Sequence, residues 1–426
     1  TVAVLLLIPL SFPRSLSMNA ADNKILYLSP INSTRKRENR EASRLSFSTS
    51  LCPAPLSTSK RQSRNVAMAG EQFDRLAELI NFDETKMGVK GLVDAGITAV
   101  PRIFLHQPEN TIDQASNETV VPTIDMAGVH SSPRRKEVVE EISRACREVG
   151  FFQIVNHGIP LEFTERLIGS VKAFHDLPGE EKTQFYARKG TGKGVSYISN
   201  IDLFNSKAAS WRDTLQVLMG NNWPNLENIP EICRNEVVEW NEHCTRVAEL
   251  LMEFLCEGLG LESQRLDDLA CSKRKTFVGH YYPWCPQPHL TLGLSAHTDP
   301  GVLTILLQDH IGGLQVKCGE KWVEVKPIPG ALVINIGDIL QMMSNDEYVS
   351  GVHRVVAHQA KEPRVSVAVF FNPMESESLF GPFPELSYPA KPPVYRQFTL
   401  TEYLEVFFNR ELDDKSLKDH FKLLTE

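Results

Sequence analysis

The chain has 426 residues, enough to bury one large hydrophobic core or two moderate ones. Its formal net charge of -8 at pH 7 argues against a general nucleic-acid-binding protein. None of the eight cysteines forms a C-x-x-C pair, so the sequence indicates no zinc site and is compatible with free thiols in a reducing compartment.

The first 67 residues differ in charge from the rest of the chain. They hold ten Lys or Arg and three acidic residues, a balance of +7 that leaves -15 for the remainder. Their Ser-, Asn- and Arg-rich composition resembles a plastid or mitochondrial transit peptide, and the apolar stretch at residues 2–10 is too short to span a membrane. Alternatively, Met68 is the ordinary start and the preceding sequence is spurious. In both cases we expect residues 1–67 to be disordered; we expect a cytoplasmic protein, or a plastid one if the transit peptide is genuine.

Residues 68–230 are expected to form an N-terminal α/β region. Its predicted elements are a strand over residues 121–125, an amphipathic helix over 134–149, a strand over 151–155 and a helix over 160–175. Residues 188–215 carry glycines and aromatic side chains without a hydrophobic period, so no regular element is predicted there. Residues 231–275 are expected to brace a sheet, mainly through a long helix over 232–257 whose apolar side chains recur at helical spacing.

From residue 276 the hydrophobic period changes to two. Short strands are predicted over residues 276–282, 302–308, 314–318, 322–325, 332–336, 352–358 and 364–371. About eight short strands with little helix between them favour a double-stranded β-helix, or jelly roll, over residues 276–375. Residues 376–426 are expected to be a C-terminal helical segment, with a capping box at Thr399 and Glu402. The fold class is therefore mainly β with flanking helices.

Two histidines and one aspartate in this region have the order of a metal-binding triad. His297 and Asp299 are two residues apart, so on an extended strand both side chains point to one face. His353 follows 54 positions after Asp299 and must be brought back by the fold. Two imidazoles and one carboxylate are the ligands of the facial triad of non-haem Fe(II) oxygenases. His157 is a further metal candidate, but a hydrogen bond from its ring to the loop backbone is the preferred interpretation.

Arg364 and Ser366 add a second signal. They lie eleven and thirteen residues beyond His353 and share one face of a predicted strand. A guanidinium offers a fork of donors that matches a carboxylate, and a hydroxyl adds one more donor. A dicarboxylate that chelates a metal at one end could be anchored here at its other end.

Several sequence blocks resemble one family. They are His280-Tyr281-Tyr282-Pro283-Trp284-Cys285-Pro286, Ser295-Ala296-His297-Thr298-Asp299, Gly312-Gly313-Leu314-Gln315-Val316, Val352-His353-Arg354 and Arg364-Val365-Ser366, with Gly150-Phe151-Phe152 upstream. Together they resemble the plant 2-oxoglutarate- and Fe(II)-dependent dioxygenases, and within them the homologues of 1-aminocyclopropane-1-carboxylate oxidase. The resemblance covers roughly residues 80 to 420.

The resemblance implies both an activity and roles for single residues. His297, Asp299 and His353 would be the catalytic Fe(II) ligands. Arg364, Ser366 and the Tyr282 hydroxyl would bind 2-oxoglutarate, with ascorbate as reductant. Tyr197 and Phe370 are the residues chosen to line the substrate pocket, although Tyr197 is about equally suited to packing. The expected reaction uses O2 to hydroxylate or otherwise oxidise a small plant specialised metabolite, with release of succinate and CO2, in a monomer without nucleic-acid or membrane partners.

Two departures from the family pattern affect these roles. His280 stands where the family usually has Asn, and the second His and the Arg are eleven rather than ten residues apart. The extra residue is expected in the turn at residues 359–362, because within a strand it would turn Arg364 to the wrong face. Three alternatives are an ascorbate-dependent enzyme like 1-aminocyclopropane-1-carboxylate oxidase itself, a non-catalytic small-molecule-binding barrel, and a storage or lectin-like jelly roll.

Overall fold

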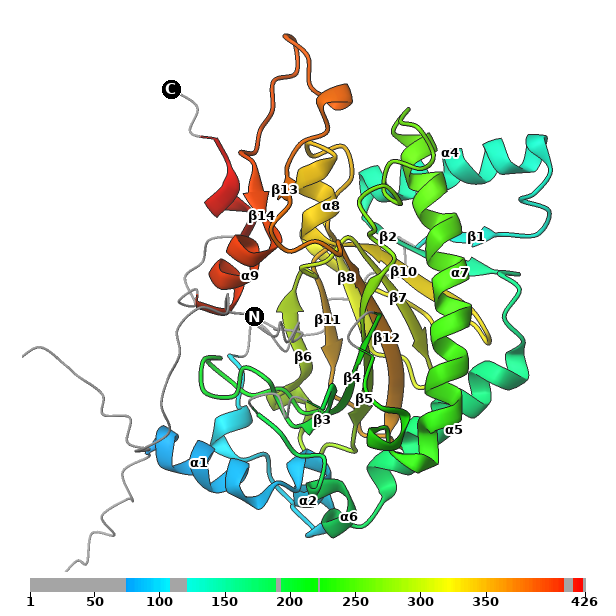
Figure 1. Ribbon diagram of the computed structural model, residues 1–426. Coiled ribbons are helices and arrows are strands. Elements are labelled where there is room, and N and C mark those ends of the chain that lie inside the picture. The colour runs from blue at the N-terminus through cyan, green and yellow to red at the C-terminus, as the bar shows by residue number, and fades with distance from the viewer. Residues whose placement is uncertain (1–73, 108–120, 189–192, 221–222, 410–416, 424–426) are drawn as a thin grey trace, which may run out of the picture. The chain divides into compact units, whose positions relative to one another are not determined.

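The computed structural model describes residues 74–107, 121–188, 193–220, 223–409 and 417–423 (Figure 1). The predictions of a transit peptide and of disorder in residues 1–67, and of a start at Met68, all lie outside the described residues. Within these described ranges, no helix is both long enough and apolar enough to cross a membrane.

The fold is built around a sheet of eight strands. In spatial order they are β1 (Thr123–Asp125), β2 (Phe151–Val155), β10 (Leu332–Ile336), β7 (Leu303–Gln308), β12 (Arg364–Asn372), β5 (Arg274–Tyr282), β4 (Asp213–Met219) and β3 (Val195–Ile198). All neighbouring pairs are antiparallel except β1 with β2. Four of the eight strands come from the N-terminal region, which therefore extends the sheet at both edges and does not form a layer of its own.

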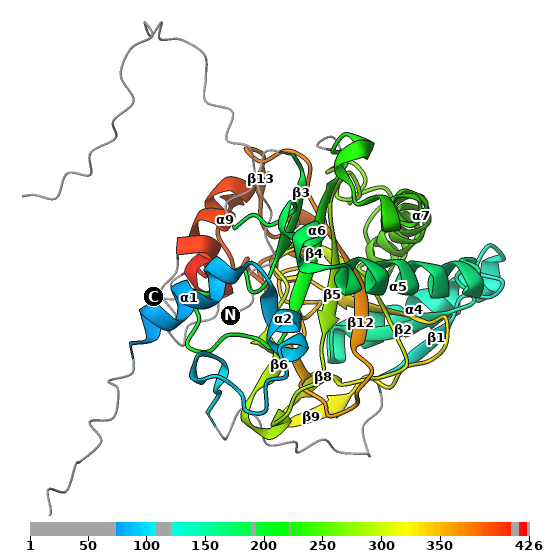
Figure 2. The same ribbon diagram turned by 90° about the horizontal axis from the view of Figure 1, so that it is seen from below.

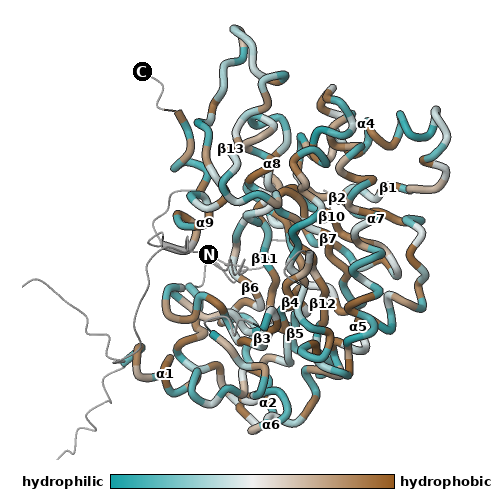
Figure 3. Tube along the Cα trace, in the orientation of Figure 1, coloured by the Kyte–Doolittle hydropathy of each residue, from teal (hydrophilic) through white to brown (hydrophobic). Residues whose placement is uncertain are grey.

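Helices cover one face of this sheet. They are α4 (Ser132–Glu148), α5 (Leu161–Asp176) and α7 (Arg234–Gly258), and Figures 1 and 2 show them on the same side. Side chains alternate between faces along a strand, so Ile305, Val367 and Phe277 join the core beneath these helices. Along α4 and α7 the trace changes repeatedly between hydrophobic and hydrophilic residues, as expected for helices with one buried face (Figure 3).

A second sheet of four strands packs against the other face. Its order is β6 (Leu292–His297), β11 (His353–Val356), β8 (Leu314–Cys318) and β9 (Lys321–Glu324), all antiparallel. Leu294, Val316 and Val355 of this sheet form a buried cluster with Phe151 and Tyr282 of the large sheet. The two sheets thus enclose a space between them, and that space holds the candidate site.

Shorter elements close the ends of the molecule's described part. They are α1 (Arg75–Thr85), α2 (Gly88–Asp94), α6 (Gly179–Thr183), α8 (Asp338–Met343), α9 (Leu400–Asn409), the pair β13 (Leu379–Phe380) and β14 (Phe398–Thr399), and the 3-10 helices η1 (Arg102–Phe104), η2 (Leu226–Asn228), η3 (Glu231–Cys233), η4 (Pro288–Leu290), η5 (Pro384–Leu386) and η6 (Leu417–Phe421). The Thr399 hydroxyl accepts from the Glu402 backbone N–H at 3.1 Å, which confirms one half of the predicted capping box, while the Glu402 carboxylate pairs with Arg396. On η6, Lys418 donates to the buried Asp338 carboxylate at 2.7 Å.

The expectation of no regular structure in residues 188–215 is wrong. This stretch contains β3 and the first part of β4, which pair with each other and, through β4, with β5. Along β4 only Thr214 and Gln216 alternate with apolar residues, and Val217, Leu218 and Met219 are consecutive apolar residues, so the two-residue period is too short to be recognised.

Candidate metal and cosubstrate site

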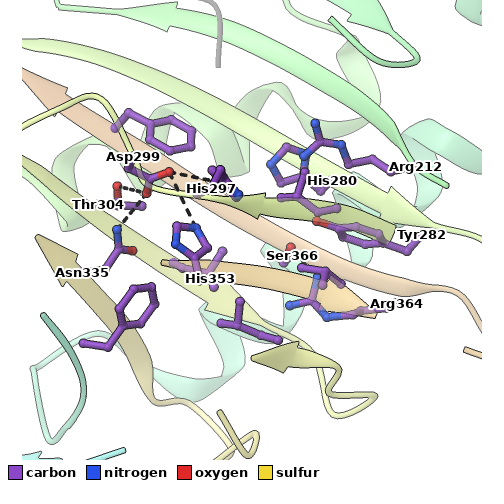
Figure 4. Close-up of a pocket in the computed structure, with 17 residues that line it drawn as sticks. Arg212, His280, Tyr282, His297, Asp299, Thr304, Asn335, His353, Arg364 and Ser366 are labelled. Atoms are coloured by element: carbon purple, nitrogen blue, oxygen red, sulfur yellow. Dashed lines mark hydrogen bonds and ion pairs between the residues drawn. The ribbon is translucent and has the colours of Figure 1, made fainter. Parts of the chain in front are cut away.

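The three predicted metal ligands lie together between the two sheets. His297 ends β6 and His353 begins β11, and the antiparallel register places these two residues directly opposite each other. Asp299 follows just after β6. One ligand atom from each residue lies within 4.8 Å of the others, and all three side chains are buried (Figure 4). Strand pairing therefore brings together residues that are far apart in the sequence.

Backbone carbonyls orient both imidazoles. The Nδ1 of His297 donates to the Ser295 carbonyl at 2.9 Å, and the Nδ1 of His353 donates to the Gly351 carbonyl at 3.1 Å. A ring that donates through Nδ1 keeps a lone pair on Nε2 while it is neutral. The two Nε2 atoms lie 3.4 and 3.7 Å from Oδ1 of Asp299. Burial lowers the pKa of His353 to about 4, so its ring is neutral at pH 7.

The two oxygens of Asp299 have different surroundings. Oδ2 accepts from the Thr304 hydroxyl at 2.7 Å and from the Asn335 amide at 2.8 Å. Oδ1 is buried and has no hydrogen-bond donor. Burial alone would raise the pKa of this carboxyl, but His353, His297 and Thr304 outweigh it and hold the pKa below its usual range. A buried anionic oxygen that faces two imidazole lone pairs is a donor set suited to a divalent cation such as Fe(II).

Arg364 is buried in the same cavity without an acidic partner. Only 1% of the residue is exposed, and its guanidinium lies 4.9 Å from the centre of the Tyr282 ring. Nη1 donates to the Ser366 hydroxyl and Nη2 to the Gln308 side-chain carbonyl, both at 3.1 Å, while Nε has no partner. Among the described residues no carboxylate lies within 4.0 Å of this guanidinium. An uncompensated buried cation is costly, so the arrangement is suited to an anionic ligand.

The eleven-residue spacing of His353 and Arg364 leaves both side chains in the cavity. β11 ends at Val356 and β12 begins at Arg364, and the pairing of β11 with β6 has register shifts between His353 and Val356. On β12, Arg364, Ser366 and Phe370 all line the cavity, as residues of one strand face should.

The cavity is lined by residues of both sheets. The metal-binding candidates lie at one end and Arg364 with Ser366 at the other, as Figure 4 shows. Leu294, Leu306, Val355, Ala368 and Phe370 give it an apolar wall. Phe370 lines the cavity, and its contact with substrate stays a prediction.

The structure contradicts the prediction that Tyr197 lines this cavity. Its side chain is fully buried in the core beneath the helices, where its ring lies 5.9 Å from that of Phe174. The hydroxyl donates to the Met87 carbonyl at 3.2 Å. Tyr197 is opposite Leu215 in the β3–β4 pair, on the helix-covered face of the sheet. The packing interpretation of this residue is therefore the correct one.

His157 has a structural role, whereas His280 lines the cavity. His157 bonds through Nε2 to the Gly330 carbonyl at 2.7 Å, as the preferred interpretation predicted. His280 lines the cavity, and its Nδ1 lies 3.0 Å from the Thr214 hydroxyl. Burial, with the charges of Arg212 and Arg364, holds the pKa of His280 well below its usual value, so the ring is neutral.

Two facing sheets that enclose two imidazoles, a carboxylate and a guanidinium without an acidic partner provide the donor set of the non-haem Fe(II) oxygenases. Comparisons with known proteins identify the family. Residues 274–373 match the 2OG-Fe(II) oxygenase superfamily, and residues 121–233 match the N-terminal region named for the non-haem dioxygenase in morphine synthesis. The chain belongs to the 2OG-Fe(II) oxygenase superfamily and is a dioxygenase.

The chain is similar to several known proteins over most of their length. The chain is 43% identical to 1-aminocyclopropane-1-carboxylate oxidase homolog 11 of Arabidopsis thaliana over 360 residues, which cover 83% of this chain and 98% of that protein. It is 40% identical to deacetoxyvindoline 4-hydroxylase of Catharanthus roseus over 388 residues, or 88% and 96% of the two chains. The solved structure of JOX2 in complex with 2OG, Fe and JA is 28% identical with a TM-score of 0.71, covering 79% of this chain and 98% of that one.

Proposed function

We propose that this dioxygenase uses 2-oxoglutarate to hydroxylate or otherwise oxidise a small plant specialised metabolite, with formation of succinate and CO2. The single observation that carries the proposal is the combination, in one cavity, of the buried His297–Asp299–His353 cluster with the unpaired Arg364 guanidinium. Neither feature alone is specific, but a metal-chelating dicarboxylate is a ligand that satisfies both ends.

The residues that line the cavity have different roles in the proposed function. Nε2 of His297, Nε2 of His353 and Oδ1 of Asp299 would hold Fe(II), and Thr304 and Asn335 keep that carboxylate in place through Oδ2. Bound Fe(II) would supply the redox chemistry that couples O2 to the oxidation of a substrate C–H bond. The protein contributes binding, orientation and the exclusion of water.

Arg364, Ser366 and Tyr282 would bind the far carboxylate of 2-oxoglutarate. Arg364 is held by Gln308 and Ser366, so its fork is already oriented before the ligand arrives. The Tyr282 hydroxyl could add one more donor. The apolar wall that includes Phe370 would hold the substrate beside the metal ligands and exclude water.

We further infer that the two sheets form a double-stranded β-helix. The strand sequence supports this: β5, β7, β10 and β12 belong to the large sheet, whereas β6, β8, β9 and β11 belong to the small one. The chain therefore passes back and forth between two facing sheets, as in a jelly roll. On this view residues 276–375 form the core of the fold, and the regions before and after it add strands and helices.

Two measurements test the proposed function. Purified protein loaded with Fe(II) is incubated with O2, a plant metabolite extract and 2-oxoglutarate, and succinate and oxidised products are measured by mass spectrometry. We expect product formation to require 2-oxoglutarate and to be abolished in Asp299→Ala, which should also bind Fe(II) more weakly under anaerobic conditions. Product formation without 2-oxoglutarate, or no Fe(II) binding by the wild type, would overturn the proposal.

A parallel assay distinguishes the ascorbate-dependent alternative. If ethylene forms from 1-aminocyclopropane-1-carboxylate with ascorbate and without 2-oxoglutarate, the enzyme resembles the oxidase itself and not its homologues. In the proposed function ascorbate serves only as a reductant that restores Fe(II), so its omission should slow turnover without abolishing the first cycles.

A further inference from the structure

Arg212 is a second buried guanidinium in the cavity, and the proposed reaction gives it no role. It directly precedes β4 and lines the cavity beside His280 (Figure 4). Only 3% of the residue is exposed, and both Nε and Nη1 lack a hydrogen-bond partner. These two buried donors of a permanently charged side chain are therefore available to hydrogen-bond a ligand in the cavity.

The surrounding acidic residues do not neutralise Arg212. Burial raises the pKa of Asp202 and the Arg212 charge opposes this, yet no ion pair within 4.0 Å joins the two among the described residues. The adjacent Asp213 turns to the opposite face of the sheet, where it accepts from the backbone N–H groups of Val89 and Lys90, each at 2.8 Å. A cation buried without a counter-charge is unfavourable, so the fold retains a positive site that a bound anion would compensate.

The position at which Arg212 would bind an anion is separate from the position at Arg364. The register pairs Asp213 with Tyr281 and Arg364 with Tyr282, so Arg212 and Arg364 lie on opposite sides of β5. Two strand spacings amount to about 10 Å between their backbones. Figure 4 shows Arg212 beside His280 and Arg364 beside Ser366, with Tyr282 between the two guanidinium groups.

The net charge of the cavity with Fe(II) and 2-oxoglutarate bound also indicates an anionic substrate. This step rests on the proposed function. 2-Oxoglutarate would place one carboxylate at Arg364 and the other at the metal. Its two negative charges, together with Asp299, balance three of the four positive charges of Fe(II), Arg364 and Arg212, and burial raises the pKa of the nearby Asp202 carboxyl, which disfavours a further anion there. A substrate that carries one negative charge would restore neutrality in this water-poor cavity.

We propose that Arg212 binds an anionic group of the substrate, a carboxylate or a chemically similar oxyanion, and so restricts the enzyme to acidic metabolites. The guanidinium presents parallel N–H donors that match such a group. The apolar wall with Phe370 takes the hydrophobic part of the same molecule. Arg212 is thus a residue that determines specificity and positions the substrate.

The test compares matched acids and amides as probes. Fe(II)-loaded protein under argon, with saturating 2-oxoglutarate, is titrated with 3-phenylpropionate and with 3-phenylpropionamide, and binding is followed by intrinsic fluorescence and by calorimetry. We expect the wild type to bind the acid at least about tenfold more tightly than the amide, the effect of one charged hydrogen-bonded contact. Arg212→Gln should abolish this preference, and Arg212→Lys should restore part of it.

Arg274→Gln is the matched control. Arg274 lies on β5 of the same sheet, donates to the Ser376 hydroxyl at 2.8 Å and does not line the cavity, so its loss should leave the preference for the acid unchanged. The melting temperature adds an independent readout. Arg212→Gln should keep or raise it, because an uncompensated buried charge is removed, whereas a purely structural arginine would lower it on substitution.

The outcomes separate this inference from the proposed function. The 2-oxoglutarate affinity of each variant is measured in the same series, and Arg212→Gln should change it by less than about twofold. A tenfold or larger loss would assign Arg212 to the cosubstrate and overturn the inference. It is also overturned if the wild type shows no preference for the acid, whether both probes bind or neither does. Failure of the wild type to bind 2-oxoglutarate would instead refute the proposed function, and this inference with it.

Discussion

Replacing Arg364 with Lys tests the cosubstrate anchor most directly, because it keeps the charge and removes only the fork. The guanidinium makes two hydrogen bonds at 3.1 Å, to Gln308 and to Ser366, and still has Nε unpartnered. A lysine ammonium is a single point donor on a flexible stem and cannot present a planar pair of N–H groups to a carboxylate. With only 1% of Arg364 exposed, water can replace little of what is lost.

The expected magnitude follows from these contacts. Losing one charge-assisted hydrogen bond to the far carboxylate of 2-oxoglutarate costs about 1.5–3 kcal/mol. That corresponds to roughly a 10- to 150-fold higher 2-oxoglutarate concentration for half-saturation. At saturating 2-oxoglutarate the rate should change much less, because Arg364 and the metal-binding cluster lie at opposite ends of the cavity (Figure 4).

The assay is succinate release at a fixed substrate concentration while 2-oxoglutarate is varied. Arg274→Lys, on the same sheet but outside the cavity, controls for the general effect of replacing an arginine. The assignment of the anchor is refuted if half-saturation in Arg364→Lys stays within about twofold of the wild type. It is equally refuted if the maximal rate falls while half-saturation is unchanged, since that would place Arg364 in the chemical step.

Three further changes test other parts of the structure. Asn335→Ala removes one of the two donors to Oδ2 of Asp299 and should weaken Fe(II) binding by about 10- to 100-fold in an anaerobic titration; unchanged affinity would contradict the role of this amide. Lys418→Met leaves the buried Asp338 carboxylate unpaired and should cost about 3–5 kcal/mol of unfolding free energy in urea, with partial recovery when Asp338→Asn is added. Alkylation of the native protein at pH 8 should label the half-buried Cys318 before the other described cysteines, which are fully buried; burial raises the pKa of all these thiols, so accessibility decides the order, and equal labelling would contradict the difference in burial.

The sequence predicted the site best where two functional residues are two positions apart, which is the side-chain period of a strand. Arg364 and Ser366 are two residues apart on β12, so their common direction follows from the geometry of a strand; His297 and Asp299 have the same spacing, but Asp299 lies just beyond the end of β6. The meeting of His297 with His353 needed the family resemblance, because it depends on strand pairing across more than fifty residues. Spacing alone contains no information on which distant strands become neighbours.

Residues that act through cross-strand neighbours could not be predicted in this way. Thr304 and Asn335 support Asp299 because β7 and β10 are adjacent and place these two residues opposite each other. Arg212 reaches the cavity because β4 pairs with β5, and β4 itself was not predicted. Tyr197 was wrongly assigned for the same reason: without strand β3 and its register, the face on which the side chain lies could not be inferred.

The fold explains why one additional residue between His353 and Arg364 is compatible with the site. Along β12 the residues at 364, 366, 368 and 370 line the cavity, whereas Val365, Val367 and Val369 pack in the core beneath the helices. An insertion within this strand would exchange the two sets, burying a guanidinium in the core and exposing three valines to the cavity. An insertion between Val356 and Arg364 lengthens a loop and leaves the alternation unchanged. The alternation of β12 is therefore what the site requires, and the number of residues that precede it is free to vary.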